Sequence, residues 1–189
     1  MILEKYGDII ELDWKFPSSV VDEINNANFG FHTRADSRDN ANETRTFVDL
    51  IGSTDSADGH TYNPIGFNEN IDKVPSLKPF LDKLNKYGGL FKARIYKLDN
   101  GSYYEPHRDH MGFGERFRIM CPLNHTNLWE YTFFYEDRLI FFKERVPYYI
   151  NTGKVHGSTT YVDGTYHLTI ALDVDGETEY EVAKLLSIF

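Results

Sequence analysis

The chain has 189 residues and a formal net charge of −9, with 41% hydrophobic and 15% aromatic residues. These values indicate one globular domain rather than a disordered chain, and the acidic balance argues against a nucleic-acid partner. A single cysteine, Cys121, excludes an internal disulfide and fits a reducing compartment. Met1 leads into charged residues, and no stretch approaches the ~20 apolar residues that span a bilayer. We therefore expect a cytoplasmic protein with no membrane partner.

The N-terminal part begins with two short regular elements. Ile9–Leu12 has the apolar character of a strand. Ser18 and Ser19 are then placed to cap a helix that carries Val20, Val21 and Ile24 at helical spacing. Both elements are expected to pack beside the main core.

Long polar stretches follow, from His32 to Asn70, interrupted by one strand-like run over Thr46–Ile51. Loops of this length in a compact domain usually have a function, so we expect them to form a substrate lid. A second helix is predicted over Pro75–Tyr87, with proline near its start and Gly88-Gly89 at its end. Residues 1–90 are thus interpreted as helical support and lid.

From Phe91 onward the sequence changes to short strands with aromatic and β-branched residues. Asn100-Gly101 and Asp163-Gly164 are strong hairpin turns between apolar runs. This pattern predicts a mainly β (α+β) protein with a double-stranded β-helix, a cupin-like jelly roll, over residues 91–174. Residues 175–189 are expected to form a closing helix. The predicted strands are Lys92–Leu98, Ser102–Asp109, Glu115–Leu123, Trp129–Tyr135, Leu139–Lys143, Pro147–Asn151, Lys154–Tyr161 and Tyr166–Asp173.

A candidate metal site lies within these strands. His107 and Asp109 are separated by one residue, and His156 follows His107 by 49 positions. In an extended strand, residues i and i+2 point the same way, so His107 and Asp109 can share an ion with His156. Two histidines and one carboxylate with open positions are typical of non-haem Fe(II) oxygenases. A plain hydrogen-bonded pair at a strand end is the alternative for an isolated His-x-Asp, and the eight-strand setting favours the metal site.

Two arginines on one strand suggest an anion site. Arg116 and Arg118 alternate with Phe117 and Ile119, so they share one face. Arginine does not enter a barrel without an anion, and its planar fork suits a carboxylate such as that of 2-oxoglutarate. The alternative places both arginines on the solvent face, and alternation alone slightly favours it.

Taken together, the ordered segments around these residues resemble the aspartyl/asparaginyl β-hydroxylase family over about residues 91–174. The segments that carry the resemblance are Arg94–Ser102, His107–Asp109, Arg116–Leu123 and Asn151–His156. The resemblance implies that His107, Asp109 and His156 bind Fe(II) and act in catalysis, and that Arg116 holds 2-oxoglutarate. The family usually has histidine where this chain has Arg118, and arginine where it has His167. The resemblance therefore assigns Arg116, Arg118 and His167 to the co-substrate, with one arginine and one histidine having exchanged places. The alternative for His167 is a histidine buried in the core.

These observations predict an oxidoreductase, a 2-oxoglutarate-dependent non-haem iron dioxygenase. It would hydroxylate an amino-acid side chain, free or in a peptide or protein, with O2 as co-substrate and decarboxylation of 2-oxoglutarate to succinate. A non-catalytic cupin-like metal or small-molecule binding module is the alternative. A metal-dependent isomerase on the same barrel is a third interpretation, which predicts activity without O2.

Overall fold

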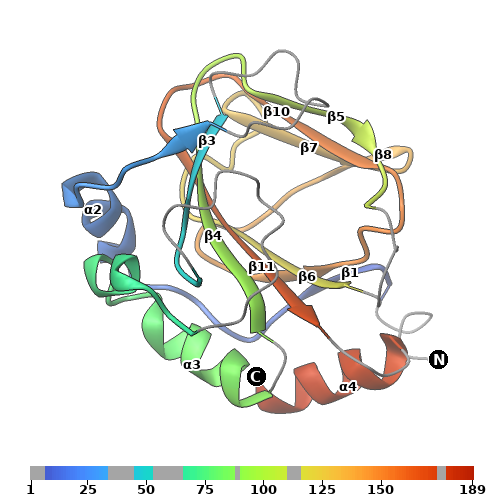
Figure 1. Cartoon of the computed structure of the whole chain (residues 1–189). Helices are drawn as coiled ribbons and strands as arrows, with labels where there is room; N and C mark the ends of the chain where they lie inside the picture. The colour runs from blue at the N-terminus through green and yellow to red at the C-terminus, as the bar shows by residue number, and fades with distance from the viewer. Residues whose placement is uncertain (1–6, 34–44, 53–65, 88–89, 110–115, 174–177) are drawn as a thin grey trace.

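Two antiparallel sheets face each other in the computed structural model, which describes residues 7–33, 45–52, 66–87, 90–109, 116–173 and 178–189 (Figure 1). The larger sheet has seven strands in the order β1-β9-β6-β11-β4-β3-β2. They are β1 (Ile9–Glu11), β9 (Tyr148–Ile150), β6 (Arg116–Pro122), β11 (Thr165–Asp173), β4 (Leu90–Leu98), β3 (Arg45–Asp49) and β2 (His32–Thr33).

The smaller sheet has four strands in the order β5-β10-β7-β8. They are β5 (Tyr103–His107), β10 (His156–Thr160), β7 (Tyr131–Tyr135) and β8 (Arg138–Ile140). The hairpin turns that lead into β5 and β11 place Gly101 at φ 84° and Gly164 at φ 70°, which glycine adopts without strain. The predicted double-stranded β-helix is therefore confirmed, with each of its eight strands near the predicted position.

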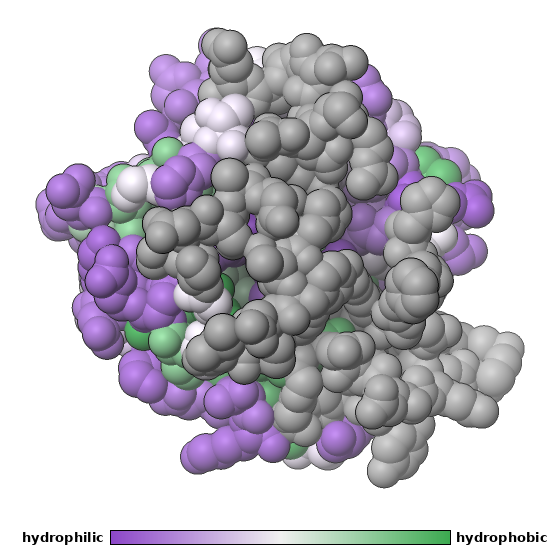
Figure 2. Space-filling view, viewed as in Figure 1, coloured by the Kyte–Doolittle hydropathy of each residue, from purple (hydrophilic) through white to green (hydrophobic). Residues whose placement is uncertain are grey.

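Three helices, α2 (Ser19–Asn26), α3 (Lys78–Tyr87) and α4 (Thr178–Ile188), flank the larger sheet on the side away from the smaller one (Figure 1). A short 3-10 helix spans Glu69–Lys73. Val20 and Ile24 of α2 and Phe80, Leu81 and Leu84 of α3 are buried against the odd-numbered side chains of β4 and β6. Hydrophilic residues dominate the outer surface of α2 and α3 in Figure 2. The apolar faces of these amphipathic helices thus cover one face of the larger sheet.

A second, smaller core fills part of the space between the two sheets. It is formed by inward-facing aromatic and aliphatic side chains of β7, β9 and the segments beside them: Leu98, Tyr131, Phe133, Tyr135, Phe142, Val146, Tyr148 and Ile150. Many of the other inward-facing positions, on β3, β4, β6, β10 and β11, carry polar or charged residues, among them Arg45, Asp49, Arg94, Arg118, His156 and His167, although Phe47 and Met120 are apolar. The interior is therefore apolar on one side and polar on the other.

The N-terminal part contributes more to the sheets than expected. β1, β2 and β3 extend the larger sheet on both sides, and Val48 pairs with Ile95 of β4. The strand β1 is confirmed, and β3 ends at Asp49, earlier than predicted, with Ile51 in an isolated bridge to Phe67. Much of the predicted lid, residues 34–44 and 53–65, lies outside the described residues, so its role stays an expectation.

Both N-terminal helices are confirmed, the first at its predicted start and the second with a later start. The predicted serine cap is wrong in detail, because Ser18 has helical φ and ψ and its side chain makes no capping hydrogen bond. Ser19 instead lies within hydrogen-bonding distance of Glu23 and of Ser76. The second helix begins at Lys78 rather than at Pro75, because residues 75–77 form a turn before it. The predicted closing helix is α4.

Candidate metal centre

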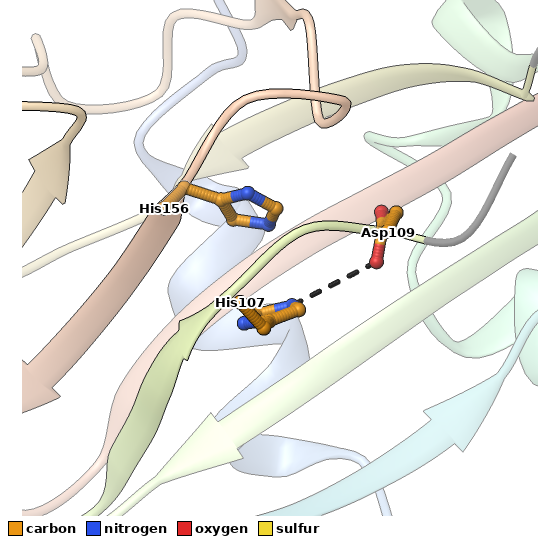
Figure 3. A group of neighbouring side chains, drawn as sticks. All are labelled: His107, Asp109 and His156. Carbon is orange, nitrogen blue, oxygen red and sulfur yellow. Dashed lines mark ion pairs between the residues drawn. The ribbon is translucent and has the colours of Figure 1, made fainter.

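The three predicted ligands meet between the sheets at one end of the barrel. His107 is the last residue of β5 and pairs with His156, the first residue of β10. The potential ligand atoms of His107, Asp109 and His156 all lie within 4.8 Å of one another. Figure 3 shows the two imidazoles on neighbouring strands, with the Asp109 carboxylate beside His107. The structure thus brings together residues that are far apart in the sequence.

Each imidazole is oriented by a backbone carbonyl. His107 Nδ1 lies 2.7 Å from the carbonyl oxygen of Glu105, and His156 Nδ1 lies 2.9 Å from that of Lys154. A carbonyl can only accept, so Nδ1 carries the proton in both rings and Nε2 presents its lone pair. Such hydrogen bonds fix the tautomer and raise the basicity of a metal-ligating histidine. Both rings are therefore preset for binding through Nε2.

Asp109 lies just beyond β5 and is held from two directions. Its backbone N–H donates to the carbonyl of Thr152 at 2.9 Å, and its Oδ2 accepts from Arg118 Nε at 3.1 Å. Its Oδ1 lies 3.7 Å from His107 Nε2. Burial alone would raise the pKa of the Asp109 carboxyl, but the contact with His107 and the positive charge of Arg118 lower it well below the ordinary value. The carboxylate stays charged, which is the form that binds a metal.

His156 is also held in its metal-binding protonation state. Only 8% of the residue is exposed. This burial lowers the pKa of its imidazole below the ordinary value. A neutral imidazole at neutral pH is the form that coordinates a divalent ion. The site therefore combines a neutral ligand, His156, with a charged ligand, Asp109.

Strict alternation along β5 gives a wrong assignment for Tyr104. It places Tyr104 on the face opposite His107, but the two rings lie 4.3 Å apart between centroids. The pairing of β5 with β10 is irregular between His107 and Tyr104, where Pro106 cannot donate a ladder hydrogen bond. The irregularity turns Tyr104 toward His107. The guanidinium carbon of Arg45 lies 4.0 Å from the centre of the Tyr104 ring, forming a cation–π contact.

Gly157, next to His156, has no room for a side chain. A Cβ atom there would overlap the ring of Phe134 and lie 2.7 Å from the carbonyl oxygen of Tyr104. We expect Gly157→Ala to destabilise the fold by about 1–3 kcal/mol, the usual cost of overpacking, and to weaken metal binding by displacing His156. Chemical denaturation and metal titration measure the two effects. Gly30→Ala is the control, because its Cβ would meet only His32 Nε2, at 3.9 Å; equal stability of the two variants would contradict the close packing.

Arg118 points into the barrel, so the solvent-face interpretation is wrong for this residue. Its side chain is 17% exposed and contacts Asp109, while Ile119 is fully buried on the helix-covered face. Alternation cannot reveal this arrangement, because both faces of β6 are covered. Arg118 Nη1 is buried without a hydrogen-bond partner in the described part of the chain. For Arg116 the structure describes the backbone alone, which pairs with Asp173.

His167 also faces the interior, but at a different depth. It pairs with Pro122 of β6, whereas Arg118 pairs with Ala171. Four residues along a strand correspond to about 13 Å, and six, as for Arg116, to about 20 Å. Arg118 and His167 therefore do not meet at a single carboxylate group.

The side chain of His167 lies in a closed environment. The residue is 4% exposed, and its ring meets Tyr131 edge-on at 4.3 Å between centroids. Burial lowers the pKa of its imidazole to about 3, so the ring is neutral at neutral pH. Its Nε2 is buried with no hydrogen-bond partner among the described residues. His167 can therefore offer a hydrogen bond to a ligand but no charge.

Sequence reasoning missed a charged group on β3 and β4. Arg94, 2% exposed, donates from Nε and Nη2 to the two carboxylate oxygens of Asp49, both at 2.8 Å. Its Nη1 lies 3.5 Å from the hydroxyl of Tyr96. Burial favours the neutral phenol, but the charges of Arg94 and Lys92 prevail and lower the pKa of Tyr96 to about 7. Lys92 and Arg94, which alternate with the apolar residues Ala93 and Ile95, are the signal that could have revealed this group.

Comparisons with known proteins show the fold. No protein-family model matches the sequence. No curated protein matches it either. Among solved structures, a 2OG-Fe(II) oxygenase family oxidoreductase from Burkholderia pseudomallei superposes with a TM-score of 0.56 at 10% identity, over 94% of this chain and 90% of that one. The viral collagen prolyl hydroxylase of Paramecium bursaria Chlorella virus-1, in a 2OG complex, gives 0.51 at 12% identity, over 89% and 97%.

A third structure is more distant. The cupin domain of Schizosaccharomyces pombe Cnp3 gives a TM-score of 0.42 at 7% identity, over 78% of this chain and 70% of that one. The first two similarities place the chain among proteins with the jelly-roll fold, and among them are 2OG-Fe(II) oxygenases. Within the described residues, no helix has the length and apolarity needed to cross a membrane.

Proposed function

We propose that the protein is a cytoplasmic Fe(II)- and 2-oxoglutarate-dependent dioxygenase that hydroxylates an amino-acid side chain, related to the aspartyl/asparaginyl β-hydroxylases. The observation that carries the proposal is the group formed by His107, Asp109 and His156. Its ligand atoms lie within 4.8 Å of one another, and both imidazoles are oriented through Nδ1 by backbone carbonyls. The group lies in a jelly roll of the kind found in solved 2OG-Fe(II) oxygenases.

The donor set fits iron. Two neutral imidazole nitrogens and one carboxylate leave the remaining positions of a six-coordinate ion open, as in other non-haem Fe(II) oxygenases. Arg118 fixes the carboxylate from behind by its hydrogen bond to Asp109 Oδ2. The chain thus supplies three ligands and the hydrogen bonds that orient them.

The barrel interior fits 2-oxoglutarate, a dicarboxylate. At the depth of His167 and one pair of residues beside it, three groups suit a carboxylate: the Nη1 of Arg94, the hydroxyl of Tyr96 and the Nε2 of His167, which has no partner among the described residues. Tyr96 and His167 are direct neighbours across β4 and β11. We assign these residues to the distal carboxylate. Arg118, beside Asp109, would lie near the metal-binding end of the same molecule, and Arg116 stays a proposed contact.

When bound, iron and 2-oxoglutarate supply the oxidising chemistry for hydroxylation, with O2 consumed and succinate formed. The chain itself holds the ligands, keeps Asp109 charged and His156 neutral, and closes the deep end of the barrel with Tyr131 against His167. This closure excludes water from the co-substrate tail. The amino-acid substrate, free or in a peptide or protein, would approach from the end where the triad lies.

The decisive experiment uses the purified protein under anaerobic conditions. Adding Fe(II) and then 2-oxoglutarate should produce a visible metal-to-ligand charge-transfer band, and admitting O2 with a panel of free amino acids and peptides should then produce succinate. Metal binding with neither the band nor succinate would contradict the dioxygenase and leave the cupin-like binding module. Turnover that needs no O2 would instead favour an isomerase.

A further inference from the structure

We propose that Lys92 and Arg118 form an anion-binding subsite, on either side of Ala171, for the carboxylate of a small substrate. This inference rests on the proposed function and adds the chemical class of the substrate, an organic acid or amino acid with a free carboxylate.

The strand register places the two cations at one level. Ala171 of β11 pairs with Lys92 of β4 on one side and with Arg118 of β6 on the other. Directly paired residues of antiparallel strands share a face, so all three point between the sheets. Two interstrand spacings separate the two cations by about 10 Å at the backbone, and their side chains are long enough to converge above the Ala171 methyl group. A carboxylate would bind above the small Ala171 side chain, between the two cations.

Both cations carry their positive charge at neutral pH. Arg118 uses Nε for Asp109, while its Nη1 is buried without a hydrogen-bond partner in the described structure. A buried, unsatisfied guanidinium nitrogen is costly unless a ligand oxygen completes it. Burial lowers the pKa of Lys92 to about 8, with the positive charges of Arg94 and Arg118 acting in the same direction, so the amine still carries its charge at neutral pH.

Depth along the barrel separates this subsite from the co-substrate tail. Lys92 and Arg118 lie at the level of the triad, where the side chains of His107 and Asp109 are 28% and 29% exposed. His167, four residues deeper on β11, is only 4% exposed. A substrate entering from solvent meets the shallow level first, and the deep level is closed by Tyr131. Because the co-substrate tail is assigned to the deep level, we assign the shallow subsite to the substrate, whose carboxylate would lie beside the metal-binding end of 2-oxoglutarate.

The test measures binding without turnover. Protein loaded with Zn(II), which cannot be oxidised, and with 2-oxoglutarate is titrated with the twenty free amino acids and with their carboxamides, using saturation-transfer NMR. We expect at least one free amino acid to bind, and its carboxamide to bind at least about tenfold more weakly, equal to about 1.4 kcal/mol. Lys92→Met should weaken the binding of the free amino acid by a similar factor, and Lys92→Arg should keep most of the wild-type affinity.

Lys97→Met is the matched control. Lys97 lies on the same strand but on the opposite face, where it pairs with Asp99 at 3.6 Å. Its substitution should leave binding unchanged. Equal affinity for acid and carboxamide, no binder in the panel, unchanged binding in Lys92→Met, or a loss of 2-oxoglutarate affinity in that variant would each overturn the subsite.

The subsite and the proposed function fail in different ways. A preference for free acids on the Zn(II) protein, with no succinate from the Fe(II) protein, would refute the dioxygenase and keep the subsite. Succinate formation with an uncharged substrate would keep the dioxygenase and refute the subsite.

Discussion

Replacing His156 with alanine should abolish Fe(II) binding while the fold survives. The substitution removes one of three ligands and leaves only His107 and Asp109. Loss of an outer hydrogen-bond partner alone typically costs 10- to 100-fold in metal affinity, so loss of a ligand should cost more than about 100-fold. The fold should persist, because the two cores are formed by apolar residues that do not include His156. A titration with Fe(II), monitored by equilibrium dialysis, measures the affinity for the metal, and circular dichroism checks the fold.

His32→Ala is the control for this experiment, because His32 lies exposed on β2 and belongs to no group of potential ligands in the described structure. It should bind Fe(II) like the wild type. Unchanged Fe(II) affinity in His156→Ala would show that the triad is wrongly assigned. A loss of affinity in both variants would instead indicate a nonspecific effect of removing histidine.

His167→Leu should stabilise the protein and at the same time weaken 2-oxoglutarate binding. Leucine fills a similar volume and removes the buried Nε2, whose lack of a partner costs about 1–3 kcal/mol. The same change removes a hydrogen bond to the charged distal carboxylate, worth about 1.5–3 kcal/mol, so the affinity for 2-oxoglutarate should fall at least about tenfold. Denaturation and the charge-transfer band of the Fe(II) protein measure the two quantities. A variant with unchanged 2-oxoglutarate affinity would contradict the assigned role of His167.

The same variant should change the response to acid. The pKa of His167 is about 3 in the folded protein and 6.5 as its ordinary value, so below about pH 6.5 the unfolded chain binds a proton that the folded one excludes. The wild type should therefore lose stability as pH falls from 6.5 toward 3, by up to about 1.4 kcal/mol per pH unit from this group. Above pH 6.5, His167 does not make the free energy of unfolding depend on pH. The free energy of unfolding, measured at several pH values, should fall less steeply in His167→Leu; parallel curves would contradict the buried, neutral state.

The strands and the closeness of His107, Asp109 and His156 could be predicted, whereas their role as metal ligands stays a prediction. Turn residues such as Asn100-Gly101 mark the ends of strands, and the short spacing of His107 and Asp109 keeps both near the end of one strand. His156 could be added because a jelly roll can bring its second and seventh strands together. Its pairing with His107 confirms the expected neighbourhood.

The surroundings of the ligands depend on long-range register and were harder to predict. Arg94 and Asp49 form their bidentate pair only because β3, from the region interpreted as support and lid, joins the larger sheet beside β4. Tyr104 turns toward His107 because the pairing of β5 is irregular. The depth difference between Arg118 and His167 follows from the pairing of β6 with β11, which no pattern within either strand reveals.

The position of β3 also means that the jelly roll is not a separable module. A fragment that begins at residue 91 would lack Arg45, whose guanidinium stacks on Tyr104, and Asp49, the partner of buried Arg94. It would also expose the edge of β4, a long strand whose unpaired backbone groups could recruit other chains. Trimming the chain to the predicted jelly-roll core, residues 91–174, should therefore give an aggregating fragment rather than a smaller folded protein. The N-terminal strands belong to the smallest unit that can fold and function.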